Sequence, residues 1–118
     1  MCGDDINNRK IKTNKEVIYY GFNDNNDVIY KNIKTENDKT IADVYIKGEY
    51  YDTYTFPFVG DHLLLNALSV ITVCYLENID KTEVKNQVSK IEHAKRRFIE
   101  EKVKSNILID DYAHHPTE

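Results

Sequence analysis

The segment DYAHHPTE at residues 111–118 holds the densest set of side chains that could do chemistry, with two carboxylates, a phenol and two imidazoles. It follows Asn106–Asp110 (NILID), an almost continuously apolar run that predicts a buried strand ending in acidic residues. Ligands of α/β folds gather beyond the carboxyl ends of strands, so the position favours a functional site. Paired histidines at a terminus also occur in solvated tails or tag remnants. Because adjacent residues such as His114 and His115 point apart on an extended segment, no metal site is predicted.

A second candidate pair is His62 and Asn66, which lie one helical turn apart at the start of an apolar helical run. Both side chains can project to one side of the helix near its N-terminus, where they could read the edge of a purine by hydrogen bonds. The alternative is that His62 caps the helix and Asn66 is a buried amide with satisfied hydrogen bonds.

The third candidate is the basic pair Arg96 and Arg97. Guanidinium groups match phosphate oxygens in pairs, so this pair could hold a phosphate. The alternative is a solvated turn. The sequence has no glycine-rich phosphate loop, no nucleophile elbow and no paired cysteine motif, so it does not encode a self-sufficient nucleotide enzyme.

The elements that must position these residues are predicted to be strands first and helices later. β-branched and aromatic residues predict an antiparallel meander, with Gly48 supplying the positive φ of a tight hairpin turn. Apolar residues alternate with polar ones over 42–47, so one face of this strand should be buried and the other wet. Pro57 and Gly60 should end the β region. The expected strands are Val17–Phe22, Val28–Lys34, Thr40–Ile46 and Tyr50–Phe56.

Two helices are expected after Gly60. Apolar residues cover nearly the whole circumference of Leu63–Leu76, which predicts a helix buried on most sides, although so short a chain has little material to surround it. Thr82–Ile91 reads as an amphipathic helix with Thr82 as its N-cap. Most of the tyrosines fall in the β region and are interpreted as sheet surface.

Composition restricts the class of protein to one domain at most. The chain has 118 residues, with 16 Lys and Arg against 20 Asp and Glu. The net charge of −4 and the lack of a cationic cluster argue against nucleic-acid binding. No run is apolar and long enough to predict a membrane span. The opening residues show no signal peptide, and Cys2 and Cys74 are too few for a secreted scaffold, so a cytoplasmic location is expected.

Three motifs, taken in order, resemble the Mur ligases of peptidoglycan synthesis: GDHLLLNAL at 60–68, RRF at 96–98 and DDYAHHPTE at 110–118. Within this family, they are most similar to the ligases that join L-alanine to UDP-N-acetylmuramate. The resemblance implies an α/β fold in which residues 1–107 are the C-terminal half of the central ATP-binding domain. Residues 108–118 would begin the link to a C-terminal domain that the chain lacks, and the chain would be a piece of a longer enzyme, inactive alone.

The resemblance also implies a reaction and roles. ATP phosphorylates the muramoyl carboxylate, the alanine amine attacks the acyl phosphate, and phosphate leaves. His62 and Asn66 match residues that contact adenine, although Leu63 stands where the family often has Asn. Arg97 matches the Arg that meets the transferred phosphate, and Asp111 the Asp that contacts the ribose. Tyr112 and His114 match residues on the substrate side, with Arg97 and His114 as the catalytic positions. The phosphate-loop Lys, the Mg²⁺ ligands and the alanine-binding residues would lie outside these 118 residues.

Two alternatives remain open. One is a ligase that joins a preformed tripeptide to the same UDP-sugar, against which Tyr112 and Glu118 argue. The other is an interaction module whose meander pairs with a partner. The isolated chain is also expected to self-associate, because the helix at Leu63–Leu76 would otherwise expose an apolar patch.

Overall fold

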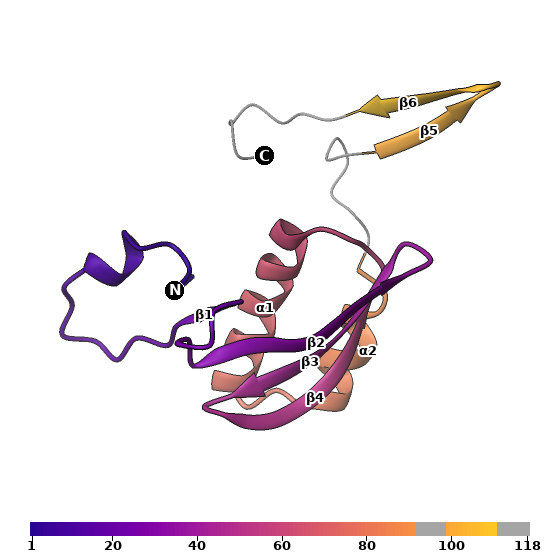
Figure 1. The fold of residues 1–118 in the computed structure, drawn as a ribbon. Helices are drawn as coiled ribbons and strands as arrows, with labels where there is room; N and C mark the ends of the chain where they lie inside the picture. Colours follow the sequence, from indigo (N-terminus) through magenta and orange to yellow (C-terminus); the bar gives the residue numbers. More distant parts are fainter. Residues whose placement is uncertain (92–98, 111–118) are drawn as a thin grey trace.

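The computed structural model describes residues 1–91 and 99–110 and shows a mixed α/β fold (Figure 1). A four-stranded sheet comes first, two helices follow, and a two-stranded hairpin ends the described part. In chain order, the elements are η1 (Asn8–Lys10), β1 (Tyr20–Gly21), β2 (Val28–Glu36), β3 (Lys39–Ile46), β4 (Glu49–Phe56), α1 (Asp61–Leu76), α2 (Lys81–Val88), β5 (Ile99–Val103) and β6 (Asn106–Asp110).

The predicted antiparallel meander is confirmed as β2, β3 and β4, which are neighbours in this order. Both of its hairpin turns have two residues with positive φ, as type I′ turns require. The φ angles are 51° at Lys47 and 85° at Gly48 in one turn, and 49° at Asn37 and 57° at Asp38 in the other. This turn type matches the right-handed twist of the strands and sets the register beside each turn. The register then shifts between Lys31 and Lys34 and between Val44 and Tyr45.

The first predicted strand, Val17–Phe22, is wrong in extent. Only Tyr20–Gly21 forms a strand, and it pairs in parallel with the start of β2. On both sides of this strand, carboxylates accept the backbone N–H groups that a longer ladder would use. Asp27 Oδ2 accepts from Tyr19 N at 2.8 Å, and Asp4 Oδ2 accepts from Phe22 N at 2.6 Å.

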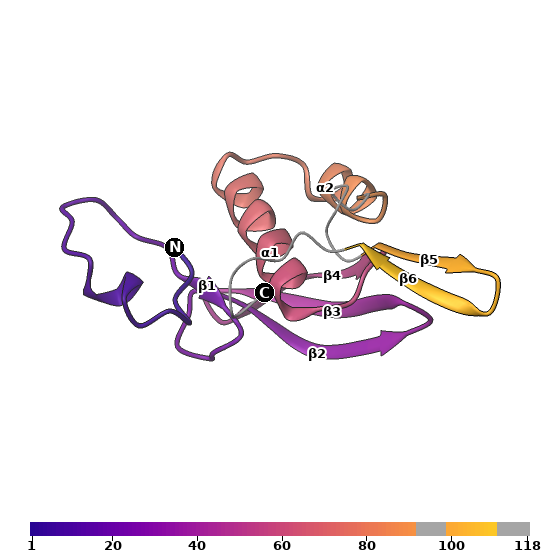
Figure 2. The ribbon, with the colours of Figure 1, turned by 90° about the horizontal axis from the view of Figure 1, so that it is seen from above.

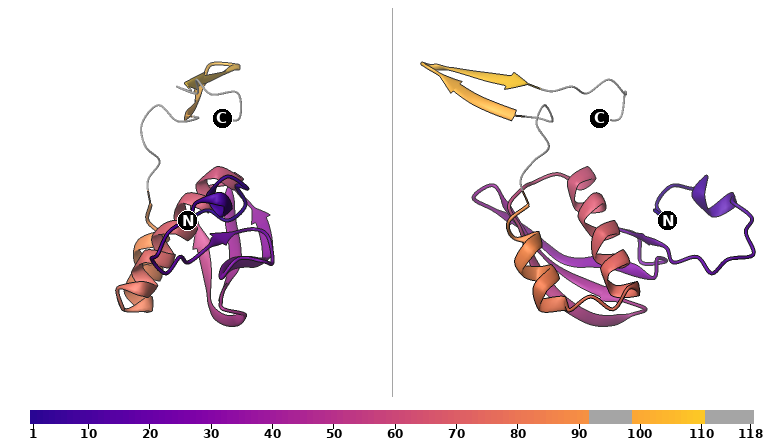
Figure 3. Two further views of the ribbon diagram at one scale, coloured as in Figure 1. Left: turned by 90° about the vertical axis from the view of Figure 1, so that its left-hand side faces the viewer. Right: turned by 180° about the vertical axis from the view of Figure 1, so that it is seen from behind.

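The core lies between one face of the sheet and the two helices, which cover the same face (Figures 2 and 3). On β3, the buried residues alternate with less buried ones, which confirms the predicted buried and wet faces. Thr40, Ala42, Val44 and Ile46 form the buried set of this strand. The opposite face carries polar contacts such as Asn32 Nδ2 donating to Asp43 Oδ2 at 2.7 Å. The fold therefore has two layers, with one face of the meander in solvent.

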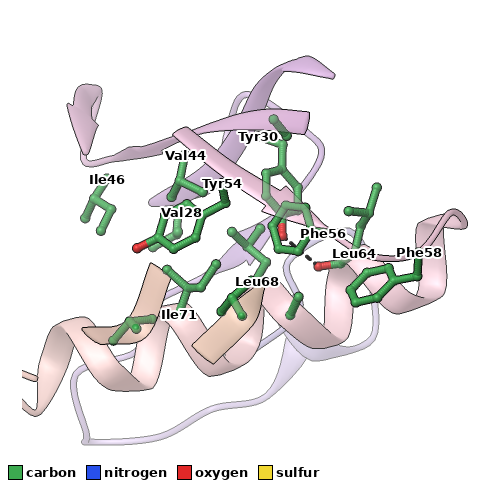
Figure 4. Close-up of a cluster of buried hydrophobic side chains, with 14 residues drawn as sticks. Val28, Tyr30, Val44, Ile46, Tyr54, Phe56, Phe58, Leu64, Leu68 and Ile71 are labelled. Carbon is green, nitrogen blue, oxygen red and sulfur yellow. Dashed lines mark hydrogen bonds between the residues drawn. The ribbon is translucent and has the colours of Figure 1, made fainter. Parts of the chain in front are cut away.

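The interpretation of the tyrosines as sheet surface is wrong for two of them. Tyr30 and Tyr54 are only 4% and 0% exposed, because they lie two residues from Val28 and Phe56, on the face of the sheet that forms the core. Their rings contact Phe56, edge-on from Tyr30 with centroids 5.7 Å apart and stacked from Tyr54 at 6.2 Å (Figure 4). Aromatic side chains are therefore part of the core between the sheet and α1.

Helix α1 begins two residues earlier than predicted, and only one of its sides is buried. The buried side consists of Leu64, Ala67, Leu68, Ile71 and Thr72. On the other side, His62, Asn66, Val70, Val73 and Leu76 follow one another at helical spacing and are all exposed. We call these five residues the outer stripe of α1. The expectation of a helix buried on most sides is therefore wrong for the described residues, because nothing among them covers this stripe.

The final predicted strand exists as β6, but it is not buried. Ile107, Leu108 and Ile109 are 63%, 55% and 51% exposed. The strand pairs in antiparallel fashion with β5, a partner that the sequence analysis did not predict. In the described part of the chain, no helix has both the length and the apolar character that crossing a bilayer requires.

Helix α2 starts at Lys81, and its N-cap is Asp80 instead of the predicted Thr82. The Asp80 carboxylate accepts hydrogen bonds from the backbone of Thr82 and Glu83, both at 3.0 Å. An Asp at this position satisfies two N–H groups that have no partner within the helix. The helix packs on α1 and β4 through Val84 and Val88.

Asp80→Ala should lower the free energy of unfolding by about 1 kcal/mol, because both N–H groups lose their acceptor. Thr82→Ala is the matched control and should change it by less than about 0.5 kcal/mol, since Ala is a good helix former. Urea unfolding followed by circular dichroism measures both. A larger loss from Thr82→Ala than from Asp80→Ala would contradict this assignment of the cap.

Candidate functional site

The structure describes two of the six predicted site residues, His62 and Asn66. Both lie at the start of α1 and both are exposed. The alternative interpretation was that His62 caps the helix and Asn66 is a buried amide. It is wrong on both points, because the N-cap is Gly60 and Asn66 is exposed. The other four, Arg97, Asp111, Tyr112 and His114, lie outside the described residues.

Gly60 determines how the chain enters α1. Its φ of 126° and ψ of 135° belong to a region that only glycine adopts readily. Its carbonyl oxygen accepts from Leu64 N at 3.1 Å, which closes the first helical turn. A Cβ at this position would lie 3.3 Å from Cε1 of His62, so the imidazole lies directly beside the glycine backbone. Gly60 thus provides both the turn and the space that the ring occupies.

A buried hydrogen bond from the sheet holds the same turn. The hydroxyl of Tyr30 donates to the carbonyl oxygen of Leu64 at 3.0 Å (Figure 4). Burial raises the pKa of Tyr30 far above its usual value, and the nearby Tyr54 raises it further. The hydroxyl therefore stays protonated and remains a donor at any physiological pH.

A second buried hydroxyl holds the connection between β4 and α1. Thr40 Oγ1, on β3, donates to the carbonyl oxygen of Phe58 at 2.8 Å. Thr40 and Tyr30 were not identified as site-related from the sequence. Tyr30 lies two residues after Val28, so the strand period predicts both on the same face of the sheet. No local sequence pattern predicts which backbone oxygen the Tyr30 hydroxyl binds.

The exposed groups of this turn suit recognition of a planar heterocycle. An imidazole offers one donor and one acceptor when neutral, and an amide offers two donors and an acceptor. His62 and Asn66 place these groups on one face of a helix, one turn apart, on a backbone that the sheet fixes. This arrangement can hydrogen-bond the edge of a nucleobase.

A polar cluster near the N-terminus is used for folding. Asp4 accepts from Phe22 N at 2.6 Å and from Asn26 Nδ2 at 2.8 Å. Burial alone would raise the pKa of Asp4, but these hydrogen bonds outweigh it and lower the pKa. Arg9 Nε donates to the carbonyl of Gly3 at 2.7 Å. In the two described ranges, no group of three or more His, Cys, Asp and Glu is placed to hold a metal ion.

Comparison with known families identifies the class of protein. Residues 2–74 match the family model described as the Mur ligase middle domain. This match covers more than half of the chain, so the chain belongs to the Mur ligase family through its middle domain. The resemblance predicted from the motifs is confirmed at the level of the family, and so is the α/β fold class.

Solved structures of Mur ligases share this fold. The UDP-N-acetylmuramate-alanine ligase MurC from Thermotoga maritima has a TM-score of 0.74 at 24% identity, over 85% of this chain and 24% of that chain. MurF from Acinetobacter baumannii has a TM-score of 0.71 at 19% identity, over 85% and 22%. MurF from Thermotoga maritima, in complex with ADP, has a TM-score of 0.58 at 17% identity, over 79% and 21%. The chain thus spans about a fifth to a quarter of the length of these proteins.

Gly60→Ala should lower the free energy of unfolding by about 1–3 kcal/mol, because alanine is strained in this backbone conformation. It should also move the imidazole resonances of His62, since the new methyl group would lie 3.3 Å from the ring. Gly48→Ala is the control, because Gly48 also has positive φ but has open space around it. Two-dimensional NMR of the histidine ring compares the two variants. Unchanged His62 resonances in Gly60→Ala would contradict the described packing of the ring.

Proposed function

We propose that the chain is part of an ATP-dependent ligase that joins L-alanine to UDP-N-acetylmuramate, the activity of MurC. The observation that carries the proposal is the pair His62 and Asn66, exposed at the start of α1 in a chain that matches the Mur ligase middle domain. The motif at 110–118 favours the alanine-adding branch. Support for ATP as co-substrate also comes from the family member that was solved with ADP.

In the proposed reaction, the muramoyl carboxylate attacks the γ-phosphorus of ATP and releases ADP. The amine of L-alanine then attacks the acyl phosphate, loses a proton, and the tetrahedral intermediate expels inorganic phosphate as the amide forms. His62 and Asn66 hold the adenine, and Asp111 holds the ribose. Arg97 stabilises the charge on the transferred phosphate. Tyr112 and His114 line the substrate side, where His114 acts with Arg97 in catalysis.

Several parts of this site belong to the rest of the enzyme in our proposal. The phosphate-loop Lys, the ligands of Mg²⁺ and the alanine-binding residues lie outside the 118 residues. Residues 1–107 form the C-terminal half of the central domain, and residues 108–118 begin the link to the next domain. The complete ligase works in the cytoplasm, and the isolated chain is inactive.

Phosphate release by the complete ligase that carries this segment tests the proposed activity. With MgATP and UDP-N-acetylmuramate, release should depend on L-alanine. Release that depends on a preformed tripeptide would assign the chain to the tripeptide-adding branch and would contradict the L-alanine assignment. If neither acceptor gives phosphate release together with amide formation, ligase activity is contradicted.

His62→Ala and Asn66→Ala should each raise the KM for ATP by about five- to tenfold, because each removes a hydrogen bond to adenine. The KM for UDP-N-acetylmuramate should not change. Glu77→Ala is the control, since Glu77 is exposed at the far end of the same helix. Steady-state kinetics with varied ATP measures the effect. An unchanged KM for ATP in both variants would show that adenine binds elsewhere.

We also propose that the isolated chain self-associates through the outer stripe of α1. Val70, Val73 and Leu76 are 51%, 57% and 49% exposed and lie next to one another on the helix. Soluble monomers seldom leave a contiguous apolar patch uncovered.

Val73→Lys should therefore reduce the self-association of the isolated chain, because it places a charge in the middle of the apolar part of the stripe. Light scattering at increasing concentration should give a mass above 13.8 kDa for the unmodified chain and a lower mass for the variant. Thr35→Lys, on the exposed end of β2, is the control and should not alter the association. A strict monomer at high concentration would contradict the proposal.

A further inference from the structure

The hydroxyl of Tyr30 links β2 to the start of α1, where His62 and Asn66 lie one turn apart. It donates to the backbone oxygen of Leu64, which lies midway between these two residues in the sequence. The residue is 4% exposed, so water does not compete for the donor. A hydrogen bond of this kind acts directly on the backbone from which both exposed side chains extend.

A second buried tyrosine shows that packing alone does not require this bond. Tyr54 contacts the same Phe56 ring and is fully buried, yet its hydroxyl has no hydrogen-bond partner among the described residues. The core therefore accommodates a tyrosine ring without satisfying its hydroxyl. The two residues differ in what the hydroxyl does, and both are buried against Phe56, which makes Tyr54 a control for Tyr30.

We propose that Tyr30 is a positioning residue of the nucleotide site: its hydroxyl fixes the first turn of α1 so that His62 and Asn66 meet the adenine together. The inference rests on the proposed function, because it assigns to Tyr30 an effect on ATP binding. Tyr30 does not touch the nucleotide in this account.

The Leu64 carbonyl oxygen can accept hydrogen bonds from two directions. A carbonyl in a helix accepts along the helix axis from the residue four positions later, and its second lone pair is free for another donor. The bond from Tyr30 uses this lone pair from the sheet side, so it resists rotation of the first turn away from β2. Two side chains that bind one planar base need a common orientation, and small rotations misalign both hydrogen bonds.

Tyr30→Phe, which retains the ring and removes the hydroxyl, tests the inference in the complete ligase. The KM for ATP should rise by about three- to tenfold, while kcat and the KM for UDP-N-acetylmuramate stay unchanged. Tyr54→Phe should change none of these values. Calorimetric titration with ADP should show the same selective loss, and amide hydrogen exchange of residues 62–66 should accelerate only in Tyr30→Phe.

The outcomes separate this inference from the proposed function. If His62→Ala raises the KM for ATP and Tyr30→Phe does not, the positioning role is overturned and the adenine site stands. If neither variant changes it, the proposed adenine site fails and the inference fails with it. If Tyr30→Phe and Tyr54→Phe weaken ATP binding equally, the effect is one of core packing and the positioning role is also overturned. Thr40→Val removes the buried hydroxyl that donates to Phe58 and should leave the exchange of residues 62–66 unchanged. Exchange there that accelerates as much as in Tyr30→Phe would overturn the specific role of Tyr30.

Discussion

The buried hydroxyl of Tyr30 constrains how α1 can lie on the sheet. A buried donor without an acceptor costs about 1–3 kcal/mol, and the carbonyl oxygen of Leu64 removes that cost at 3.0 Å. Hydrophobic packing between the layers has no direction of its own, so a shift of the helix would keep much of the apolar contact. The hydrogen bond would be lost in such a shift. One polar contact therefore fixes the position that many apolar contacts leave open, and the placement of His62 follows from it.

The outer stripe of α1 combines two kinds of surface. Its first two turns present His62 and Asn66, and the later turns present Val70, Val73 and Leu76. The solved members of the family are several times longer than this chain, and in our proposal further segments of the complete ligase cover this apolar face. The hairpin of β5 and β6 also carries exposed apolar residues, namely Val103, Ile107, Leu108 and Ile109. A two-stranded hairpin has little stability without further packing.

The sequence predicted those features that depend on a local pattern. The alternation at Ala42, Val44 and Ile46 identified the buried face of β3, and Gly48 identified a hairpin turn. The helical spacing of His62 and Asn66 predicted that both project from one side of the helix, and the three motifs identified the family.

Features that depend on contacts between distant residues were missed. The shortening of β1 depends on a carboxylate 18 residues away, since Asp4 accepts from Phe22 N. The contact of Tyr30 with Leu64 spans 34 residues and exists only once α1 has docked. The α2 cap was missed for a different reason: Asp80 and Thr82 are both common N-cap residues, and the backbone geometry decides between them.

The central claim is that the start of α1 binds the adenine of ATP in a Mur ligase. A crystal structure of the complete ligase with a non-hydrolysable ATP analogue tests it most directly. The account predicts adenine nitrogen atoms within about 3.2 Å of polar side-chain atoms of both His62 and Asn66. Adenine bound at another surface, with His62 and Asn66 in solvent, would contradict it.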